Sequence, residues 1–351
     1  MSSTPAQAPK PPSRTKKIVS AVLTLAVLAF VFFGLFPRFA DISEVWDSLA
    51  GMPTASVIAV LVAVLVNIAV YPWPFQAALI GLRYWPAFEV RQTAFAISNT
   101  VPAGGALGLG LQYAMLNSYG FAAGANAGAI AITGTWNAYL TLVLPILALL
   151  PLALVGDGFS QWLTPALIGV AIAIGSALVF ALILRSESFA RRLGHWLDRL
   201  IDRISGWFKR DSKPSVTDSI LEFRASIVDT VARRWASITG SNLLMQLTSF
   251  AVLYAALIGI EGGAANVGLA EAFAAFAIAR LATFIPVTPG GLGTTDAAMA
   301  ALLAGFGASN ADALAAVLVW RIGTLVPQVV LGAVTFLVWR ARSNRTAAKQ
   351  A

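Results

Sequence analysis

Long apolar stretches, with very few charges between them, take up most of this chain. The first spans residues 18–36, and the others lie at about 54–82, 94–120, 124–155, 162–184, 236–260, 267–305 and 311–339. Only 11% of the 351 residues are Asp, Glu, Lys or Arg, whereas a soluble domain carries about 25%. So few charges cannot cover a soluble protein, and a hydrophobic share of 58% excludes a disordered chain. The sequence therefore predicts an all-α polytopic membrane protein.

Residue types that commonly build catalytic and metal centres are scarce. The chain has no Cys, and His195 is its single His, which excludes thiolate chemistry, disulfides and multi-His metal sites. The sequence contains no Walker-type glycine loop, no His-Glu-x-x-His and no Gly-x-Ser-x-Gly motif. We therefore expect no metal, no cofactor and no ATP hydrolysis, and a transporter rather than an enzyme.

The positions of the 24 Lys and Arg residues predict which segments face the cytoplasm. Residues 1–17 carry four of them, residues 185–235 carry eleven and residues 340–351 carry four. The positive-inside rule places these segments in the cytoplasm, together with Arg83 and Arg91. Topology in a cell membrane (inner or plasma), with both tails cytoplasmic, thus explains the net charge of +8, and we expect no nucleic-acid partner. The acids expected on the outer side are Asp41, Glu44, Asp47, Asp157 and Glu261.

The first stretch, 18–36, follows a tail (1–17) rich in Pro, Ser and Ala that we expect to be disordered. A secretory signal is the alternative, but the apolar core of a signal has only about 7–15 residues. The run here is longer and ends at Phe36-Pro37-Arg38, which favours an uncleaved first span.

Sidedness then fixes how often the chain crosses the membrane. Six full crossings are expected, at 18–36, 54–82, 124–155, 162–184, 236–260 and 311–339. The stretches 94–120 and 267–305 must each begin and end on one side, which predicts two re-entrant helical hairpins. Their tips are expected at Pro102-Ala103-Gly104-Gly105 and Pro289-Gly290-Gly291. Broken backbone at membrane depth is tolerated only where it is buried in protein or lines a cavity.

The two parts of the chain at 18–155 and 162–339 resemble each other. The matching segments are 77–82 with 255–260, 94–97 with 275–278, and Trp136 with Trp320. Their offsets stay between 178 and 184 residues. Three crossings per part is an odd number, which predicts inverted repeats as in many transporters. A chance similarity between Gly-rich helices is the alternative.

A polar insertion at 186–234 interrupts the second repeat. Residues 187–210 separate an apolar face from a basic one with helical spacing, Lys213-Pro214 breaks the pattern, and residues 216–231 resume it. A hairpin of two amphipathic helices suits the anionic lipids of the inner leaflet. A platform for a cytoplasmic protein partner is the alternative. We expect His195, on the first of these helices, to be interfacial or solvated.

Charges inside apolar stretches are costly and therefore mark candidate functional residues. The turn Pro289-Gly290-Gly291-Leu292-Gly293 lets backbone N–H groups converge at a helix N-terminus, which together with two arginines suits a phosphate. Asp296 is expected to cap this helix, to pair with an Arg, or to bind a cationic group or a proton. The predicted head-group site consists of Arg280, Gly290, Gly291, Gly293, Thr294, Thr295, Asp296 and Arg321. Uncharged residues are predicted to line the cavity from the first repeat: Asn99, Pro102, Gly104, Gly105, Gln112 and Asn137.

The segment Phe284-Ile285-Pro286-Val287-Thr288-Pro289-Gly290-Gly291-Leu292-Gly293-Thr294-Thr295-Asp296, followed by Trp320-Arg321 and Pro327, resembles a known family. This is the flippase-like integral membrane family, also described as the lysylphosphatidylglycerol synthase transmembrane region, and the resemblance covers about 18–340. In that family the acid of the motif is usually Glu, whereas here it is Asp296, which has a shorter reach.

The resemblance implies inverted repeats with re-entrant helices, and movement of lipids between leaflets. Full-length synthases carry a soluble aminoacyl-transfer domain after the membrane region. No such domain is expected here, where the chain ends at Ala351, and this favours lipid translocation over lipid aminoacylation.

Three functions remain open from the sequence. The favoured one is a flippase or transporter whose substrate is a membrane lipid with a phosphate, either a phospholipid or a polyprenyl-linked lipid. The second is a membrane transferase that uses a polyprenyl-phosphate sugar, with Asp41 and Glu44 as candidate acids. The third is a scaffold on which the 186–234 hairpin holds a cytoplasmic enzyme.

Overall fold

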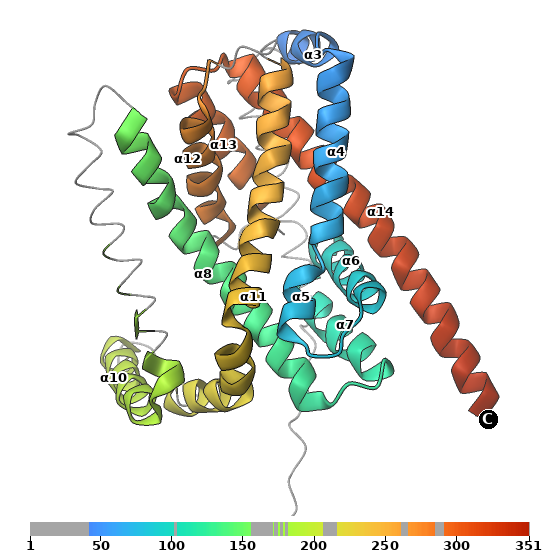
Figure 1. The fold of residues 1–351 in the computed structure, drawn as a ribbon, viewed down its shortest axis with the longest axis vertical. Coiled ribbons are helices and arrows are strands. Elements are labelled where there is room, and N and C mark those ends of the chain that lie inside the picture. The colour runs from blue at the N-terminus through green and yellow to red at the C-terminus, as the bar shows by residue number, and fades with distance from the viewer. Residues whose placement is uncertain are drawn as a thin grey trace, which may run out of the picture.

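The computed structural model describes residues 42–101, 104–155, 182–205, 216–260, 266–284 and 291–350, together with a few single positions between 171 and 179. All regular elements in this part of the chain are helices, as predicted (Figure 1). They are α3 (Ile42–Ala50), α4 (Thr54–Val70), α5 (Trp73–Ala78), α6 (Tyr84–Thr100), α7 (Gly104–Ser118), α8 (Ala123–Val155), α10 (Glu187–Ser205), α11 (Val216–Ile260), α12 (Leu269–Ala279), the 3-10 helix η2 (Arg280–Phe284), α13 (Thr294–Gly305) and α14 (Asn310–Gln350).

Four helical segments of the described chain are long and apolar enough to cross a membrane. They are Thr54–Ala78, Ala123–Ala148, Ile227–Ile260 and Asn310–Ser343. These segments correspond to four of the six predicted crossings. The 1–17 tail, the 18–36 crossing and almost all of the 162–184 crossing lie outside the described residues. The protein is thus a helical membrane protein.

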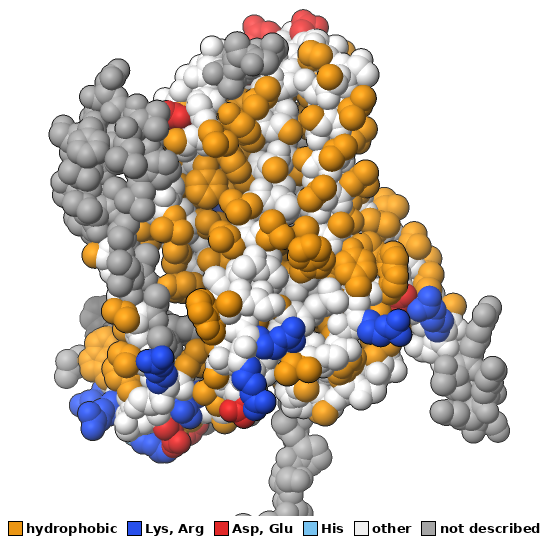
Figure 2. All heavy atoms as spheres, in the orientation of Figure 1, with side chains coloured by type: hydrophobic (Ala, Val, Ile, Leu, Met, Phe, Trp, Pro, Cys, Tyr) orange, Lys and Arg blue, Asp and Glu red, His pale blue; other side chains and the backbone are white. Residues whose placement is uncertain are grey.

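The surface supports this assignment. Large apolar side chains on α4 and α14 face outward; Leu65, for example, is 65% exposed and Leu337 is 63% exposed. Figure 2 shows apolar side chains over the body of the molecule, with Lys and Arg gathered at the end that carries α10 and the last turns of α14. Water would not stabilise such a surface, whereas lipid tails would.

The polar insertion folds as a pair of packed helices at this basic end. Its first helix is α10, and its second is the beginning of α11. Gly194 lets the two helices approach, because a Cβ there would lie 2.6 Å from the Cα of Thr217. The Thr217 hydroxyl donates a 2.7 Å hydrogen bond to Asp198 Oδ2, which ties the pair together. His195 is exposed on α10, as predicted.

The second insertion helix does not stop before the next apolar segment. α11 continues through a kink at Arg234, whose φ of −129° and ψ of 16° are not helical, and runs on to Ile260. Arg234 Nη1 donates a 3.3 Å hydrogen bond to the carbonyl of Gln76, so the kink is attached to α5. One helix therefore carries both the amphipathic segment and the apolar one.

Two pairs of shorter helices pack between the long ones. α6 packs against α7, and α12 with η2 packs against α13 (Figure 1). Gly104 allows the tight turn between α6 and α7, because a Cβ at this position would lie 2.2 Å from the carbonyl oxygen of Ile97. In the other pair, Gly291 and Gly293 have φ of +69° and +83°, which L side chains rarely adopt. Both glycine-rich turns thus require glycine for physical reasons.

Candidate functional site

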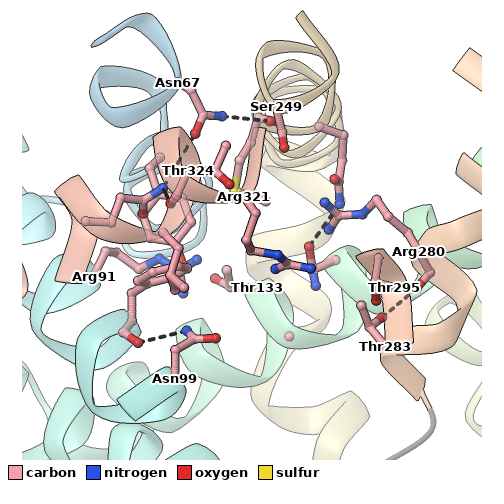
Figure 3. A pocket seen from close by; sticks show the side chains of 18 of the residues that line it. Asn67, Arg91, Asn99, Thr133, Ser249, Arg280, Thr283, Thr295, Arg321 and Thr324 are labelled. Carbon is pink, nitrogen blue, oxygen red and sulfur yellow. Dashed lines mark hydrogen bonds between the residues drawn. The ribbon is translucent and has the colours of Figure 1, made fainter. Parts of the chain in front are cut away.

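A cavity of about 350 Å³ lies among the long helices and both short helical pairs (Figure 3). Residues from α4, α6, α7, α8, α11, η2, α13 and α14 contribute to its wall, so both parts of the chain build it. Many of the side chains in the wall are polar. They include Asn67, Arg91, Asn99, Gln112, Thr133, Asn137, Gln246, Arg280, Thr295, Arg321 and Gln328.

Asp296 and Arg321 form an ion pair at the edge of this cavity. Nε and Nη2 of Arg321 lie 2.6 Å and 2.5 Å from Oδ1 of Asp296. The other carboxylate oxygen, Oδ2, accepts a 2.8 Å hydrogen bond from the backbone N–H of Gly293, at the start of α13. Asp296 is only 3% exposed. One short acid therefore both caps α13 and neutralises an arginine, which are two of the roles left open for it.

Arg280 stands at the start of η2 and has no acidic partner among the described residues. Its guanidinium lies 5.3 Å from the ring centroid of Phe276, one helical turn earlier. Its Nε is buried and makes no hydrogen bond within the described part of the chain. The sequence predicted that Arg280 and Arg321 would share a site, and the structure brings both to one cavity.

Arg91 is a charged site residue that was not predicted. The positive-inside rule assigned it to the cytoplasmic surface, but its side chain lines the cavity. Its guanidinium lies 4.6 Å from the ring centroid of Tyr71, and its Nε is buried without a partner. The rule counts bases near the ends of a span and ignores the direction in which each one points. The sequence signal that could have revealed Arg91 is its position in the second turn of an apolar helix, rather than at the end of one.

The amides predicted from the first repeat also reach the cavity. Asn99, Gln112 and Asn137 all line it, and Asn137 Oδ1 accepts a 3.1 Å hydrogen bond from Gln246 Nε2. Three further amides in apolar segments also line this wall and were not predicted: Asn67, Gln246 and Gln328.

The predicted glycines have a different place. Gly104, Gly105, Gly291 and Gly293 are not part of the cavity wall, and neither is Thr294; they shape the two turns. Thr295 does line the cavity, and its hydroxyl is buried without a hydrogen-bond partner. Pro102 and Gly290 lie outside the described residues.

The charges of this site suit an anion. Among the described residues, three guanidinium groups face the cavity or its edge, and a single carboxylate balances one of them. No group of three or more His, Cys, Asp or Glu side chains is placed to hold a metal ion in the described part of the chain. Arginine offers a planar fork of donors that matches phosphate oxygens.

Comparison with protein families gives one match. The model described as the lysylphosphatidylglycerol synthase TM region matches residues 18–332. No curated protein matches the chain.

Proposed function

The chain belongs to the family of the lysylphosphatidylglycerol synthase TM region, and from this premise we propose that it is a flippase that moves a phosphate-bearing lipid between membrane leaflets. The lipid is a phospholipid or a polyprenyl-linked lipid, and its head group passes through the central cavity. Movement is downhill or coupled to an ion gradient, without ATP hydrolysis. The protein is a transporter and not an enzyme.

The observation that carries this proposal is a pair of unpaired arginines inside a membrane protein. Arg91 and Arg280 line the cavity from different parts of the chain, and neither has an acidic partner among the described residues. A buried unpaired charge in a membrane is costly unless function requires it. A phosphate head group would supply the missing negative charge and the acceptor oxygens.

Inverted repeats are part of the proposal, and one contact at the centre supports them. The side-chain amide of Asn67 donates to Thr248 Oγ1 at 3.0 Å and lies 3.5 Å from the carbonyl oxygen of Met245. The sequence separations are 178 and 181 residues, which are the offsets of the matching segments. A residue next to the twofold axis that relates two repeats contacts its own counterpart in the other repeat. We therefore propose that the axis passes between α4, which carries Asn67, and α11, which carries Met245 and Thr248.

Reciprocal packing of the short helices also supports the repeats. Gly332 of α14 packs so closely on α6 that an added Cβ would lie 2.5 Å from Cβ of Ala96. The counterparts of these residues, at offsets of 184 and 181, are Ala148 of α8 and Ala277 of α12. Those two residues share a buried cluster. Each repeat thus offers its last long helix to the short pair of the other repeat.

We further propose that both short pairs are re-entrant hairpins. α12 and α13 have 11 and 12 residues, and α7 has 15, whereas a full crossing needs about 20. In Figure 1 the pair α6–α7 lies in the half of the molecule nearer α10, and α12–α13 lies in the half nearer α3. Opposite placement is what inverted repeats require.

At three matched positions of the site, a charged residue of the second repeat corresponds to an amide of the first. At the repeat offsets of 181 and 184 residues, Asn99 corresponds to Arg280, Gln112 to Asp296, and Asn137 to Arg321. All three amides line the same cavity as the two arginines. We propose that Arg280 and Arg321, together with Arg91 of the first repeat, hold the phosphate and that the three amides contact the rest of the head group.

The basic end of the molecule is proposed to lie in the cytoplasm of the cell, at the inner face of its membrane, with both termini on that side. Trp196 on α10 and Trp235 at the kink of α11 are 53% and 61% exposed. Exposed Trp beside basic residues suits a lipid interface, so the α10–α11 pair rests on anionic inner-leaflet lipids. Of the two acids considered for a transferase, Glu44 is exposed on α3 and does not line the cavity, and Asp41 lies outside the described residues.

Reconstitution tests this function. Purified protein in liposomes is expected to expose a fluorescent phospholipid of the inner leaflet to an impermeant quencher added outside. Arg321→Ala should abolish this movement, because it removes a cavity cation and leaves Asp296 buried without its partner. Arg191→Ala is the matched control, since Arg191 is exposed on α10, where it pairs with Glu187 one turn earlier, and does not line the cavity. Liposomes in which no phosphate-bearing lipid moves would refute the proposal.

A further inference from the structure

The charges around the cavity do not balance. Among the described residues that line it, three are Arg and none is Asp or Glu. Asp296 contributes one carboxylate through its ion pair with Arg321. Two positive charges in this part of the chain are therefore left without a negative partner.

These two charges belong to Arg91 and Arg280. Each guanidinium lies over an aromatic ring, 4.6 Å from the centroid of Tyr71 and 5.3 Å from that of Phe276. A ring face orients a guanidinium but supplies no full negative charge. The Nε atoms of both residues are also buried without hydrogen-bond partners. Both groups are thus held in place and left to be satisfied by a ligand.

Arg91 and Arg280 lie on different sides of the cavity, so a ligand that binds both must offer hydrogen-bond acceptors on more than one side. Arg91 comes from α6 and Arg280 from η2, and in Figure 3 they enter the cavity from opposite sides with Arg321 between them. A phosphodiester carries one negative charge, so it would leave one of the two guanidinium groups uncompensated. A phosphomonoester carries about −1.5 to −2 charge at pH 7 and has three strong acceptor oxygens.

Building on the proposed transport function, we propose that the cavity selects a dianionic head group, namely a lipid that ends in a phosphomonoester or a diphosphate. Its charge matches the surplus of the cavity, and it has enough acceptor oxygens for both unpaired arginines. Zwitterionic and cationic head groups, such as those of aminoacylated phospholipids, fit poorly because they leave the surplus in place. Inorganic phosphate offers the same chemistry without a lipid tail, so the test must separate the two sources.

The test compares head groups of graded charge in the reconstituted protein. Fluorescent lipids with one acyl composition are used: phosphatidic acid, phosphatidylglycerol, phosphatidylcholine and lysylphosphatidylglycerol. We expect phosphatidic acid to cross at least about ten times faster than phosphatidylglycerol, because a buried cation left without its anion is strongly disfavoured. Uptake of radiolabelled inorganic phosphate into the same liposomes should stay at the level of protein-free liposomes.

Charge variants assign the preference to its residues. Arg91→Gln and Arg280→Gln should each reduce the phosphatidic acid to phosphatidylglycerol ratio to about one to three, because one surplus charge is gone. Arg91→Lys and Arg280→Lys keep the charge and should retain the preference even if the rate falls. Arg191→Gln, which changes an exposed residue outside the cavity, should behave like the unaltered protein.

The outcomes separate this inference from the proposed function. If lipids cross but phosphatidic acid has no advantage, or if the Gln variants keep it, dianion selection is wrong and the flippase proposal stands. If inorganic phosphate is taken up as fast as phosphatidic acid crosses, the substrate is the free anion. If no lipid crosses at all, the proposed function fails and this inference with it. Melting curves of each variant in detergent show whether a lost activity reflects unfolding.

Discussion

Gly104 and Gly105 were both predicted as hairpin-tip residues, but only Gly104 lacks room for a side chain. A Cβ at Gly104 would lie 2.2 Å from a backbone oxygen of α6, whereas a Cβ at Gly105 meets nothing within 4 Å. Gly104→Ala should therefore destabilise the protein by about 1–3 kcal/mol through overpacking, and Gly105→Ala should change little. Melting curves of the two purified variants measure this difference. Equal melting temperatures would show that the α6–α7 turn is not as tight as described.

Asp296 concentrates two interactions on one buried carboxylate. Asp296→Asn keeps the shape but removes the charge, so Arg321 would be left as a buried cation without its partner. We expect a loss of about 3–5 kcal/mol in stability, which is typical of breaking a buried ion pair from one side. Asp296→Asn combined with Arg321→Gln should recover most of this loss, since no unpaired charge then remains. Unfolding in graded denaturant checks both, and a double variant no better than the single one would contradict the pairing.

Several site residues were predictable from the sequence because charge in an apolar stretch is rare. Arg280, Asp296 and Arg321 stood out in this way, and the structure brings them to one cavity edge. Arg91 was missed because the positive-inside rule, which placed it at the cytoplasmic surface, says nothing about the direction of its side chain. Which way a side chain points depends on how α6 packs against α14, and that contact joins residues more than 200 positions apart.

At the scale of elements, the kink in α11 is the feature that hydropathy did not locate. The sequence predicted an amphipathic hairpin at 186–234 followed by an apolar crossing at 236–260, but one helix runs on through Arg234 into the apolar segment. Residues 216–239 contain no Pro or Gly, the residues that most often break or kink a helix. The sequence therefore gives no signal for the kink at Arg234. By contrast, the four apolar segments were predictable from length and composition alone, because a helix must be long and apolar to cross a bilayer.

The attachment of this kink can be tested with two adjacent arginines. Arg234 donates to the Gln76 carbonyl on α5, whereas Arg233 is exposed. Arg234→Ala should speed amide hydrogen exchange around the kink by about five- to tenfold, as expected for losing one charge-assisted hydrogen bond worth about 1 kcal/mol or more. Arg233→Ala should leave exchange unchanged. Identical exchange in both variants would mean that packing alone holds the kink.

At the scale of the whole molecule, the absence of cysteine makes the proposed orientation easy to test. Ala50→Cys places a thiol on the exposed end of α3, and Ser188→Cys places one on exposed α10. In intact cells, an impermeant maleimide should label the first variant and not the second, and permeabilised cells should show both. The reverse pattern would place the basic end outside and overturn the orientation.

In the proposed transport cycle, Arg91 and Arg280 would carry two uncompensated charges whenever the cavity holds no ligand. Moving uncompensated charges between the two sides of a membrane is costly, and a bound dianion would neutralise them. The proposed carrier should therefore reorient more readily when loaded than when vacant. We therefore expect counterflow: efflux of labelled lipid from one leaflet should accelerate when the same lipid, unlabelled, is supplied to the opposite leaflet. Such a protein would exchange molecules across the membrane rapidly and would accumulate them slowly.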